Sequence, residues 1–559
     1  MNNLQHYFKA HKSILLTLLV SGILGGIVFI ALFGVAVVNP MYVDWLRGDG
    51  GDLSQHFIGW LFYRQSDWSP ILGSINTLAY PHGIAVTFMD AIPLFAIPFK
   101  FLSPLLPETF QYFGIWGLMS YILMGSFGGL ILHHLTKNAR FAIVGSLIFS
   151  LSPIVAQRMF AHTALAGQWI ILVGIFLLLR LSKQSRLSRF IIAWALVMSV
   201  SAAIHPYFIP MSGALMLMSA VLTFQKVSDL IARILAPLAA GIVTFVIIGG
   251  FTVTEVATGG AREFGVNLNT LFNSMGWSVF LERLPSTKGT YEGFAYLGLG
   301  IIALLGMAGL LFIIAKRPKG FRLKERVKTF FKSRWFVVVL IGVGLLVAAL
   351  SPTINAGSDQ IALYLPTILE KIWSVFRATG RLFWPLYYLL LVGILFVFYL
   401  YTKKRLGRVM FMSFFSLFVL IQAVDIIQSP NAQTKHTVLS RADVVYSSSI
   451  DEAHLEKVKG SRTHIQYVGQ TDNQSFFALA YFGAAHHMTI SDGYFSRSPY
   501  KAITRTSLQA RQDLLQGKGQ SDTVYVTRDP EVVEFALGSD TLSAYQEGTE
   551  YIITTKPSS

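Results

Sequence analysis

Cysteine is absent from this chain of 559 residues, and charged residues make up only 13% of it. Without cysteine the chain can form no disulfide, no thiolate metal site and no cysteine nucleophile. Hydrophobic residues reach 53%, which is too much apolar surface to close around one soluble core. The composition therefore predicts a polytopic α-helical membrane protein.

Apolar residues gather in about eleven runs of the length that crosses a bilayer. The runs lie near residues 14–38, 111–132, 141–156, 164–180, 190–205, 208–224, 232–251, 294–315, 335–351, 382–402 and 409–427. The first run is longer than a signal-peptide core and lacks a clear small-residue cleavage site, so it predicts a retained span.

Acidic residues are scarcer than basic ones, 29 against 45, which gives a net charge of +16. We do not read this charge as a nucleic-acid site, because Lys and Arg cluster in short segments between apolar runs, as cytoplasmic loops do. The strongest such segment is KRPKGFRLKERVKTFFKSR at 316–334. Alternation from it predicts a multi-pass membrane protein with its N-terminus inside and everything after about residue 430 outside.

The stretch 84–107 is apolar enough to be taken for another span, but it holds Asp90, Lys100 and four prolines. These residues suit an amphipathic segment in the membrane interface better than a lipid-facing helix. Counting the stretch as a span would also place two basic loops on the outer side. We therefore predict one long outer loop, 39–110, with interfacial helices.

The segment 430–559 is more polar and predicts a small α/β domain outside the membrane, after a membrane domain over 1–429. The expected strands are TVLS, HIQYV, DTVYVT and EYIITT, and the expected helices cover 451–459 and 503–516.

The outer loop begins with three carboxylates, Asp44, Asp49 and Asp52, in and around RGDGGDLSQHFIGW at 47–60. The glycines between them allow a tight turn and a close approach to a ligand. LSQHFIGWLFYR has an amphipathic helical pattern, which places Asp52 at a helix N-cap. Capping and general-base catalysis both remain open for Asp52.

Other polar residues fall in outer loops or at outer span ends of this topology. They are His56, Asp90, Arg158, His162, His205, Arg262, Glu292, Arg377 and Arg381. Arginines four apart on a helix share a face and suit phosphate oxygens, although snorkelling to lipid headgroups is an equal alternative. A lone interfacial histidine is more often structural than catalytic. No His/Glu spacing resembles a zinc site, and a divalent cation at DGGD needs ligands from elsewhere.

The order of these features resembles the GT-C superfamily of membrane glycosyltransferases. More narrowly, the chain resembles a bacterial GT-C-like family, DUF6311, in GDLSQHFIGWLFYR, INTLAYPHGIAVTFMDAIPL, FAHTALAGQW, YEGFAYLGLG, FRATGRLFWP and ISDGYFSRSP. The superfamily takes sugar from a polyprenyl-phosphate carrier and places it on an acceptor outside the cytoplasmic membrane. The resemblance thus implies a lipid-linked sugar donor, an envelope glycan acceptor and a place in the bacterial cytoplasmic membrane.

The resemblance also implies that an aspartate early in the first outer loop is the general base. Asp52 is the first choice, Asp49 the second and Asp44 the third. DGGD departs from the acidic-X-acidic pattern of the superfamily, which leaves open both the base and a need for Mg²⁺ or Mn²⁺. Arg377, Arg381 and Arg262 are the expected phosphate ligands, and the other residues named above are expected to bind substrate.

Two other functions stay open at this stage. A transporter or flippase of a lipid-linked glycan predicts charges at mid-span and paired broken helices. A catalytically silent scaffold for envelope polymer predicts that Asp52→Asn has no effect in cells.

Overall fold

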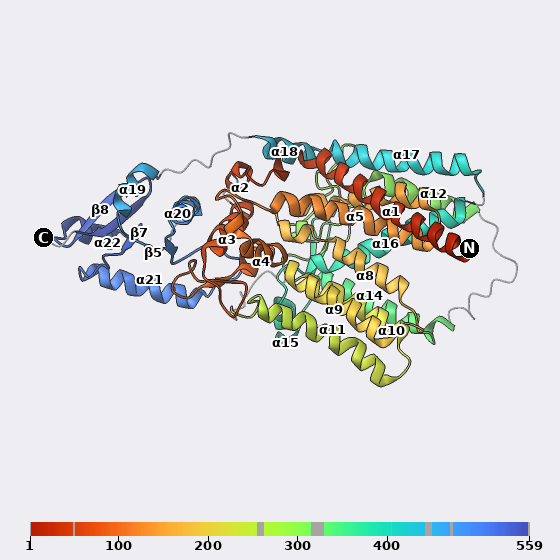
Figure 1. Cartoon of the computed structure of the whole chain (residues 1–559), viewed down its shortest axis with the longest axis horizontal. Helices are drawn as coiled ribbons and strands as arrows, with labels where there is room; N and C mark the ends of the chain where they lie inside the picture. The colour runs from red at the N-terminus through yellow and green to blue at the C-terminus, as the bar shows by residue number, and fades with distance from the viewer. Residues whose placement is uncertain are drawn as a thin grey trace.

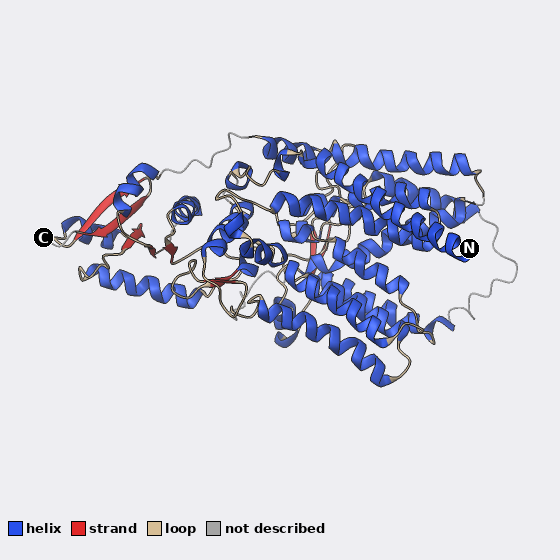
Figure 2. Ribbon diagram, viewed as in Figure 1, coloured by secondary structure: helices blue, strands red, loops and turns tan. Residues whose placement is uncertain are grey.

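A bundle of long helices forms one end of the molecule, and a mixed α/β layer forms the other (Figure 1). The structure is a computed structural model, which describes residues 2–48, 51–253, 262–314, 329–403, 405–441, 450–469 and 473–556. The short helices α2, α3 and α4 lie between the two ends (Figures 1 and 2). The N-terminus lies at the far end of the bundle from the α/β layer.

The bundle is built from the helices of the first three-quarters of the chain. They are α1 (Asn2–Phe33), α5 (Phe113–Thr136), α6 (Ala139–Ser150), α7 (Pro153–Arg158), α8 (Trp169–Arg180), α9 (Leu187–Ile204), α10 (Phe208–Thr223), α11 (Val227–Ile247), α12 (Leu299–Ile314), α14 (Arg334–Leu350), α15 (Thr367–Ser374), α16 (Trp384–Thr402), α17 (Arg408–Ile427) and α18 (Pro430–Ser440). A hairpin of β3 (Thr353–Ala356) and β4 (Asp359–Ala362) follows α14.

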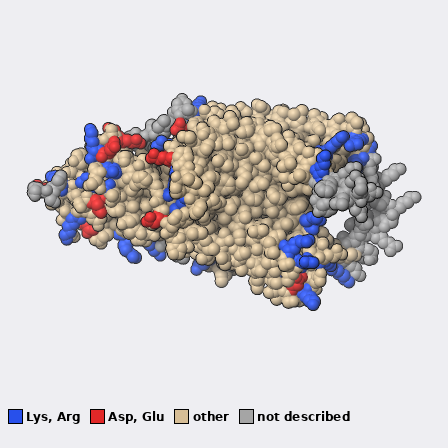
Figure 3. All heavy atoms as spheres, in the orientation of Figure 1, with Lys and Arg blue, Asp and Glu red and all other residues tan. Residues whose placement is uncertain are grey.

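Eight helical stretches in the described part of the chain are long and apolar enough to cross a membrane. The three remaining runs expected from the sequence fall on shorter apolar helices, at Phe208–Thr223, Leu299–Leu310 and Arg334–Leu350. Figure 3 shows a broad zone without charged side chains over the bundle, and Lys and Arg gather at the end nearest the N-terminus. These features indicate a membrane protein, and the orientation stays a prediction.

Small residues let α1 and α5 pack backbone to backbone. A Cβ on Gly25 would lie 2.2 Å from the Tyr121 carbonyl oxygen, and one on Gly125 would lie 2.2 Å from that of Ser21. Ser126 hydroxyl also donates to the Leu18 carbonyl at 3.1 Å. Such close contacts stabilise helix pairs where lipid removes the hydrophobic driving force.

Among its described residues, the segment 39–110 contains no helix long enough to span a membrane. Its elements are α2 (Asp44–Arg47), α3 (Asp52–Gln65), β1 (Ser74–Ile75), β2 (Ile84–Ala85) and α4 (Pro93–Phe101). The nine residues of α4 rise only about 14 Å. The helix α3 is buried along nearly its whole length, from Leu53 to Tyr63.

The C-terminal part is a five-stranded mixed sheet in the order β6-β5-β7-β9-β8. Its strands are β5 (His464–Val468), β6 (Thr489–Ile490), β7 (Thr523–Thr527), β8 (Leu542–Glu547) and β9 (Glu550–Thr555), and its helices are α19 (Glu452–Lys459), α20 (Asn473–Ala485), α21 (Tyr500–Leu515) and α22 (Pro530–Gly538). The strands β5, β6 and β7 are parallel, whereas β9 is antiparallel to both β7 and β8. The expected strand TVLS is wrong, since these residues end α18, which packs on α1.

The sheet continues into the segment 39–110. Leu78 forms a parallel bridge with Ile490, whose amide donates to the Thr77 carbonyl at 2.9 Å. The Ile490 carbonyl accepts from the Tyr80 amide at 2.8 Å, and the Tyr80 ring stacks on His464 at 4.8 Å. The α/β layer is thus joined to residues 77–80 by backbone pairing.

Candidate functional site

Asp52 lies where the membrane part meets the C-terminal part. It is the first residue of α3, and Gly51 occupies the N-cap, so the capping alternative for Asp52 is wrong. Its Oδ2 lies 3.2 Å from Nδ1 of His162, and its Oδ1 accepts from the Tyr494 hydroxyl at 3.2 Å. The Asp52 side chain is 36% exposed, so its carboxylate is both held and open to solvent.

A buried carboxylate, Glu292, connects this pair to two arginines. Glu292 Oε2 lies 2.7 Å from Arg158 Nη2 and 2.8 Å from Arg381 Nε, while Oε1 lies 3.7 Å from His162 Nε2. Burial alone raises the pKa of Glu292, but Arg158 and Arg381 outweigh it and hold the pKa well below its usual range. Glu292 is therefore ionised at neutral pH and shared between two guanidinium groups.

Asp90 forms a second buried group with two histidines. Its backbone is left-handed at φ 55°, and its carboxylate lies 3.5 Å from His56 Nε2 and 3.3 Å from His205 Nε2. Burial lowers the pKa of His205 to about 4 despite the opposing pull of Asp90. Burial raises the pKa of Asp90, but His205 and His56 outweigh it and leave that pKa well below its usual value. At neutral pH the carboxylate is ionised and the His205 ring neutral.

The proton of His205 can be placed from its second ring nitrogen. Nδ1 accepts from the Tyr207 amide at 3.2 Å, so the neutral ring carries its proton on Nε2, facing Asp90. A protonated nitrogen is not free to ligate a metal. Among the described residues, no group of three or more His, Asp or Glu side chains has the arrangement to hold a metal ion.

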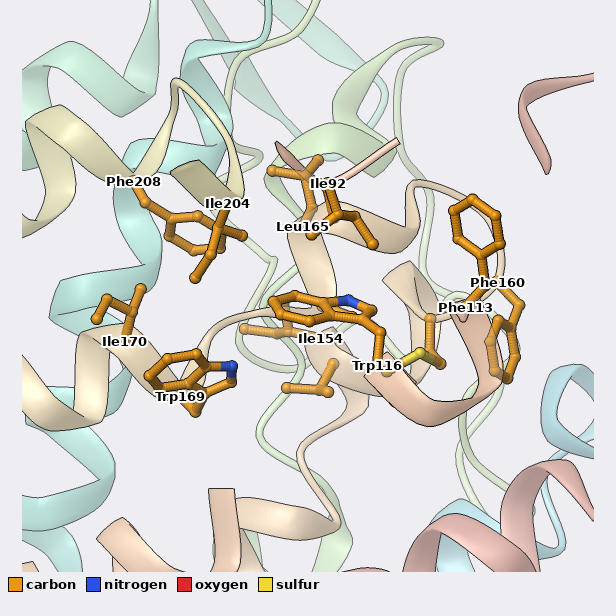
Figure 4. Packing of buried hydrophobic residues seen from close by; sticks show 14 of the residues in the cluster. Ile92, Phe113, Trp116, Ile154, Phe160, Leu165, Trp169, Ile170, Ile204 and Phe208 are labelled. Atoms are coloured by element: carbon orange, nitrogen blue, oxygen red, sulfur yellow. The ribbon is translucent and has the colours of Figure 1, made fainter. Parts of the chain in front are cut away.

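A rigid apolar wall supports these polar groups. Figure 4 shows Trp116 and Trp169 packed with Ile92, Phe113, Ile154, Phe160, Leu165, Ile170, Ile204 and Phe208. Trp116 is fully buried and donates from Nε1 to the Thr163 carbonyl at 3.0 Å, next to His162. His56 stacks on Phe113 with ring centroids 6.3 Å apart. The cluster thus packs against His56 and anchors the residue that follows His162.

The expected arginine pair does not share a helix face. Arg377 follows the end of α15 in a bend, is exposed, and stacks over Phe264 with its guanidinium carbon 4.9 Å from the ring centroid. Arg381 is buried in a 3₁₀ turn, on Glu292 and over the Tyr207 ring at 4.6 Å. The third expected phosphate ligand, Arg262, forms an exposed ion pair with Glu370 instead.

The candidate aspartate Asp44 stands apart from this network. Asp44 begins α2 and makes no ion pair with any residue that the structure describes. Asp49 lies outside the described residues. Of the two described aspartates, Asp52 is the one that the structure brings together with Glu292 and the arginines, through His162.

Three further residues complete the surroundings and were not expected from the sequence. Tyr494 and Arg497 lie on the loop after β6, and Arg497 Nη2 donates to the Val375 carbonyl at 2.7 Å. Lys435 of α18 donates to the carbonyls of Ala156, Gln157 and Met159, which close the helix that carries Arg158. The motif ISDGYFSRSP was the one sequence signal that pointed to Tyr494 and Arg497.

Comparison with protein families agrees with this division of the chain. The family model described as domain of unknown function DUF6311 matches residues 22–427, more than half of the chain. The chain belongs to the DUF6311 family. A second model, the DUF6311 C-terminal domain, matches residues 454–555. In this DUF6311 protein, Asp52, His162 and Glu292 fall in the first match, whereas Tyr494 and Arg497 fall in the second. No curated protein matches the chain.

Proposed function

We propose that this DUF6311 chain is a glycosyltransferase of the GT-C type, which moves a sugar from a polyprenyl-phosphate carrier to a cell-envelope glycan at the outer face of the cytoplasmic membrane. The observation that carries the proposal is Asp52. This carboxylate is one-third exposed, is held by His162 and Tyr494, and lies beside a buried Arg–Glu–Arg group.

Asp52 is suited to take the proton of an acceptor hydroxyl. In the proposed step the acceptor oxygen bonds to the anomeric carbon of the sugar, the bond from that carbon to the phosphate oxygen breaks, and the hydroxyl proton moves to Asp52. His162 and Tyr494 fix the carboxylate in one orientation from either side. Inversion at the anomeric carbon follows if no covalent sugar intermediate forms.

The electron pair of the broken bond stays on the lipid phosphate, which needs a cationic neighbour. Arg377 is exposed, and Arg381 lies four residues further on, at the buried end of the same segment. Guanidinium groups suit phosphate oxygens because their donors form a planar fork. The proposed mechanism routes no step through a metal ion.

The place of the charges favours an enzyme over a transporter. Arg158 ends one candidate span, Ala139–Arg158, and Arg381 lies near the start of another, Thr379–Thr402. A transporter of a lipid-linked glycan would place its ionisable residues near the middle of spans.

The test compares envelope glycans from cells that lack the chain and are complemented with wild type, Asp52→Asn or Asp44→Asn. We expect Asp52→Asn to slow transfer by about 10²–10⁴-fold, so that mass spectrometry finds one sugar missing from the glycan. Asp44→Asn is the matched control, because Asp44 lies outside the network, and it should restore the sugar.

Three results would contradict the proposal. Full transfer by both Asp52→Asn and Asp49→Asn, each folded and inserted, would remove the assigned base. A glycan of unchanged composition that accumulates on the inner face would indicate a transporter. Unchanged glycans in cells without the chain would indicate a scaffold.

A further inference from the structure

The loop 491–499 of the C-terminal part is fixed onto the membrane part at three points. Tyr494 donates to Asp52, and the Ser496 amide and hydroxyl both donate to the Phe88 carbonyl, at 3.0 and 2.9 Å. Arg497 Nη2 then donates to the Val375 carbonyl, at 2.7 Å. These bonds hold Arg497 beside the segment that carries Arg377, two residues after Val375.

The segment 375–378 is itself firmly placed. The Ala378 amide donates to the Tyr207 hydroxyl at 2.6 Å, and the Phe376 ring lies 5.4 Å from the Tyr207 ring. Burial raises the pKa of Tyr207, and both Arg381 and Arg497 act electrostatically to lower it. Tyr207 is thus an electrostatic neighbour of both Arg381, whose guanidinium lies over its ring, and Arg497.

Arg377 and Arg497 differ from the other arginines of this region in having no carboxylate. Arg158 and Arg381 share Glu292, and Arg262 pairs with Glu370. Within the described ranges, no Asp or Glu lies at ion-pair distance from Arg377 or Arg497. The Arg377 guanidinium instead stacks on the Phe264 ring, and Arg497 donates from one nitrogen to a backbone carbonyl. Their remaining donors are available to an anion.

We infer that Arg497 and Arg377 together form a phosphate-binding site, made half by the C-terminal part and half by the membrane part. A phosphate ester of a lipid fits it, because the two planar forks supply donors to separate oxygens and the site lies at the end of the apolar bundle. Arg381 lies beneath, already paired with Glu292, and acts as a positioning residue for Tyr207 rather than as the main phosphate ligand.

This inference rests on the proposed function only for the identity of the ligand, which is the phosphate of the lipid-linked sugar donor. Arg497 and Arg377 are the groups that would bind it. A binding measurement tests it without sugar transfer. The full chain in phosphatidylcholine nanodiscs is titrated with farnesyl phosphate, with farnesol and with inorganic phosphate. Farnesol has the same apolar tail without the charge, and inorganic phosphate has the charge without the tail.

Farnesyl phosphate should bind, and both Arg497→Gln and Arg377→Gln should weaken it about tenfold or more. Arg497→Lys should recover only part of the affinity, because an ammonium group keeps the charge and loses the fork. Arg505→Gln is the matched control, because Arg505 is an exposed arginine of α21 on the same part of the chain. It should bind farnesyl phosphate like wild type, and melting temperatures should show that all variants fold.

Equal affinity of wild type and Arg497→Gln for farnesyl phosphate would overturn the inference, as would equal binding of farnesol. If inorganic phosphate binds as tightly as farnesyl phosphate and with the same arginine dependence, the anion site stands and its source is free phosphate. If binding depends on Arg497 while no sugar transfer is found in cells, the proposed function fails alone. If transfer depends on Asp52 and Arg497→Gln binds and transfers normally, this inference fails alone.

Discussion

Glu292→Gln should destabilise the protein more than any other single loss of charge in the network. The amide keeps the size of the side chain and part of its hydrogen bonding but removes the negative charge shared by Arg158 and Arg381. Glu292 is 5% exposed, and the side chains of the two arginines are 3% and 9% exposed. Breaking a buried ion pair by removing one partner costs about 3–5 kcal/mol, because the remaining charge stays buried without compensation.

The assay is thermal unfolding of the full chain in detergent, followed by intrinsic fluorescence. With an unfolding entropy proportional to chain length, the expected loss lowers the melting temperature of the helical part by roughly 3–5 °C. Glu370→Gln is the matched control, because the Arg262–Glu370 pair has side chains that are 42% and 38% exposed. Exposed pairs contribute about 0–1 kcal/mol, so this control should stay close to wild type.

A double variant separates charge from packing. Glu292→Gln combined with Arg158→Met leaves a single buried guanidinium instead of two, and part of the lost stability should return. The reasoning is refuted if Glu292→Gln has the same melting temperature as wild type, or if Glu370→Gln is destabilised as much as Glu292→Gln.

Two further predictions concern packing and pH. Gly114→Ala should lower the free energy of unfolding by about 1–3 kcal/mol or more, because a Cβ there would lie 1.7 Å from the Val37 carbonyl oxygen. Gly306→Ala is the control, since a Cβ there would meet nothing within 4 Å, and it should be neutral or slightly stabilising in the same melting assay. Equal shifts in the two glycine variants would contradict this. Burial lowers the pKa of His205 from 6.5 to about 4, so the unfolded chain binds more protons than the folded chain between these two pH values. Up to about 3 kcal/mol of stability should therefore be lost as the pH falls from 6.5 to about 4. Melting curves of wild type and His205→Gln between pH 7 and pH 4 should therefore converge, and parallel curves would show that His205 is not the group involved.

The periodicity and length of apolar runs were enough to predict most of the architecture. They placed helices on all eleven runs and excluded a span at 84–107, where Asp90 and four prolines oppose one. The strands HIQYV, DTVYVT and EYIITT were also right, because each is rich in the β-branched and aromatic residues that strands favour. TVLS failed because the capping hydroxyl of Ser429 and Pro430 start a helix that continues through it.

The candidate site could be predicted in membership but not in pairing. The sequence singled out Asp52, His162, Glu292 and Arg381. It does not show that Glu292 neutralises Arg381, or that a turn separates Arg381 from Arg377. Helical spacing assumes a helix, and the Thr379–Phe383 segment forms a 3₁₀ turn instead. Arg497 is brought in by the docking of a separate sheet, which is a tertiary contact that local patterns do not encode.

The pairing of Leu78 with Ile490 also has a consequence for biosynthesis. A ribosome completes residues 77–80 long before it reaches β6, so the polar backbone around Leu78 must wait, unpaired, while the remaining helices are made. Tyr494 and Arg497 emerge only a few residues after β6. The nascent protein thus gains the pairing of Leu78 with β6 and the last groups around Asp52 in a single late docking event. A chain that ends before β6 would carry Asp52 without Tyr494 and Arg497.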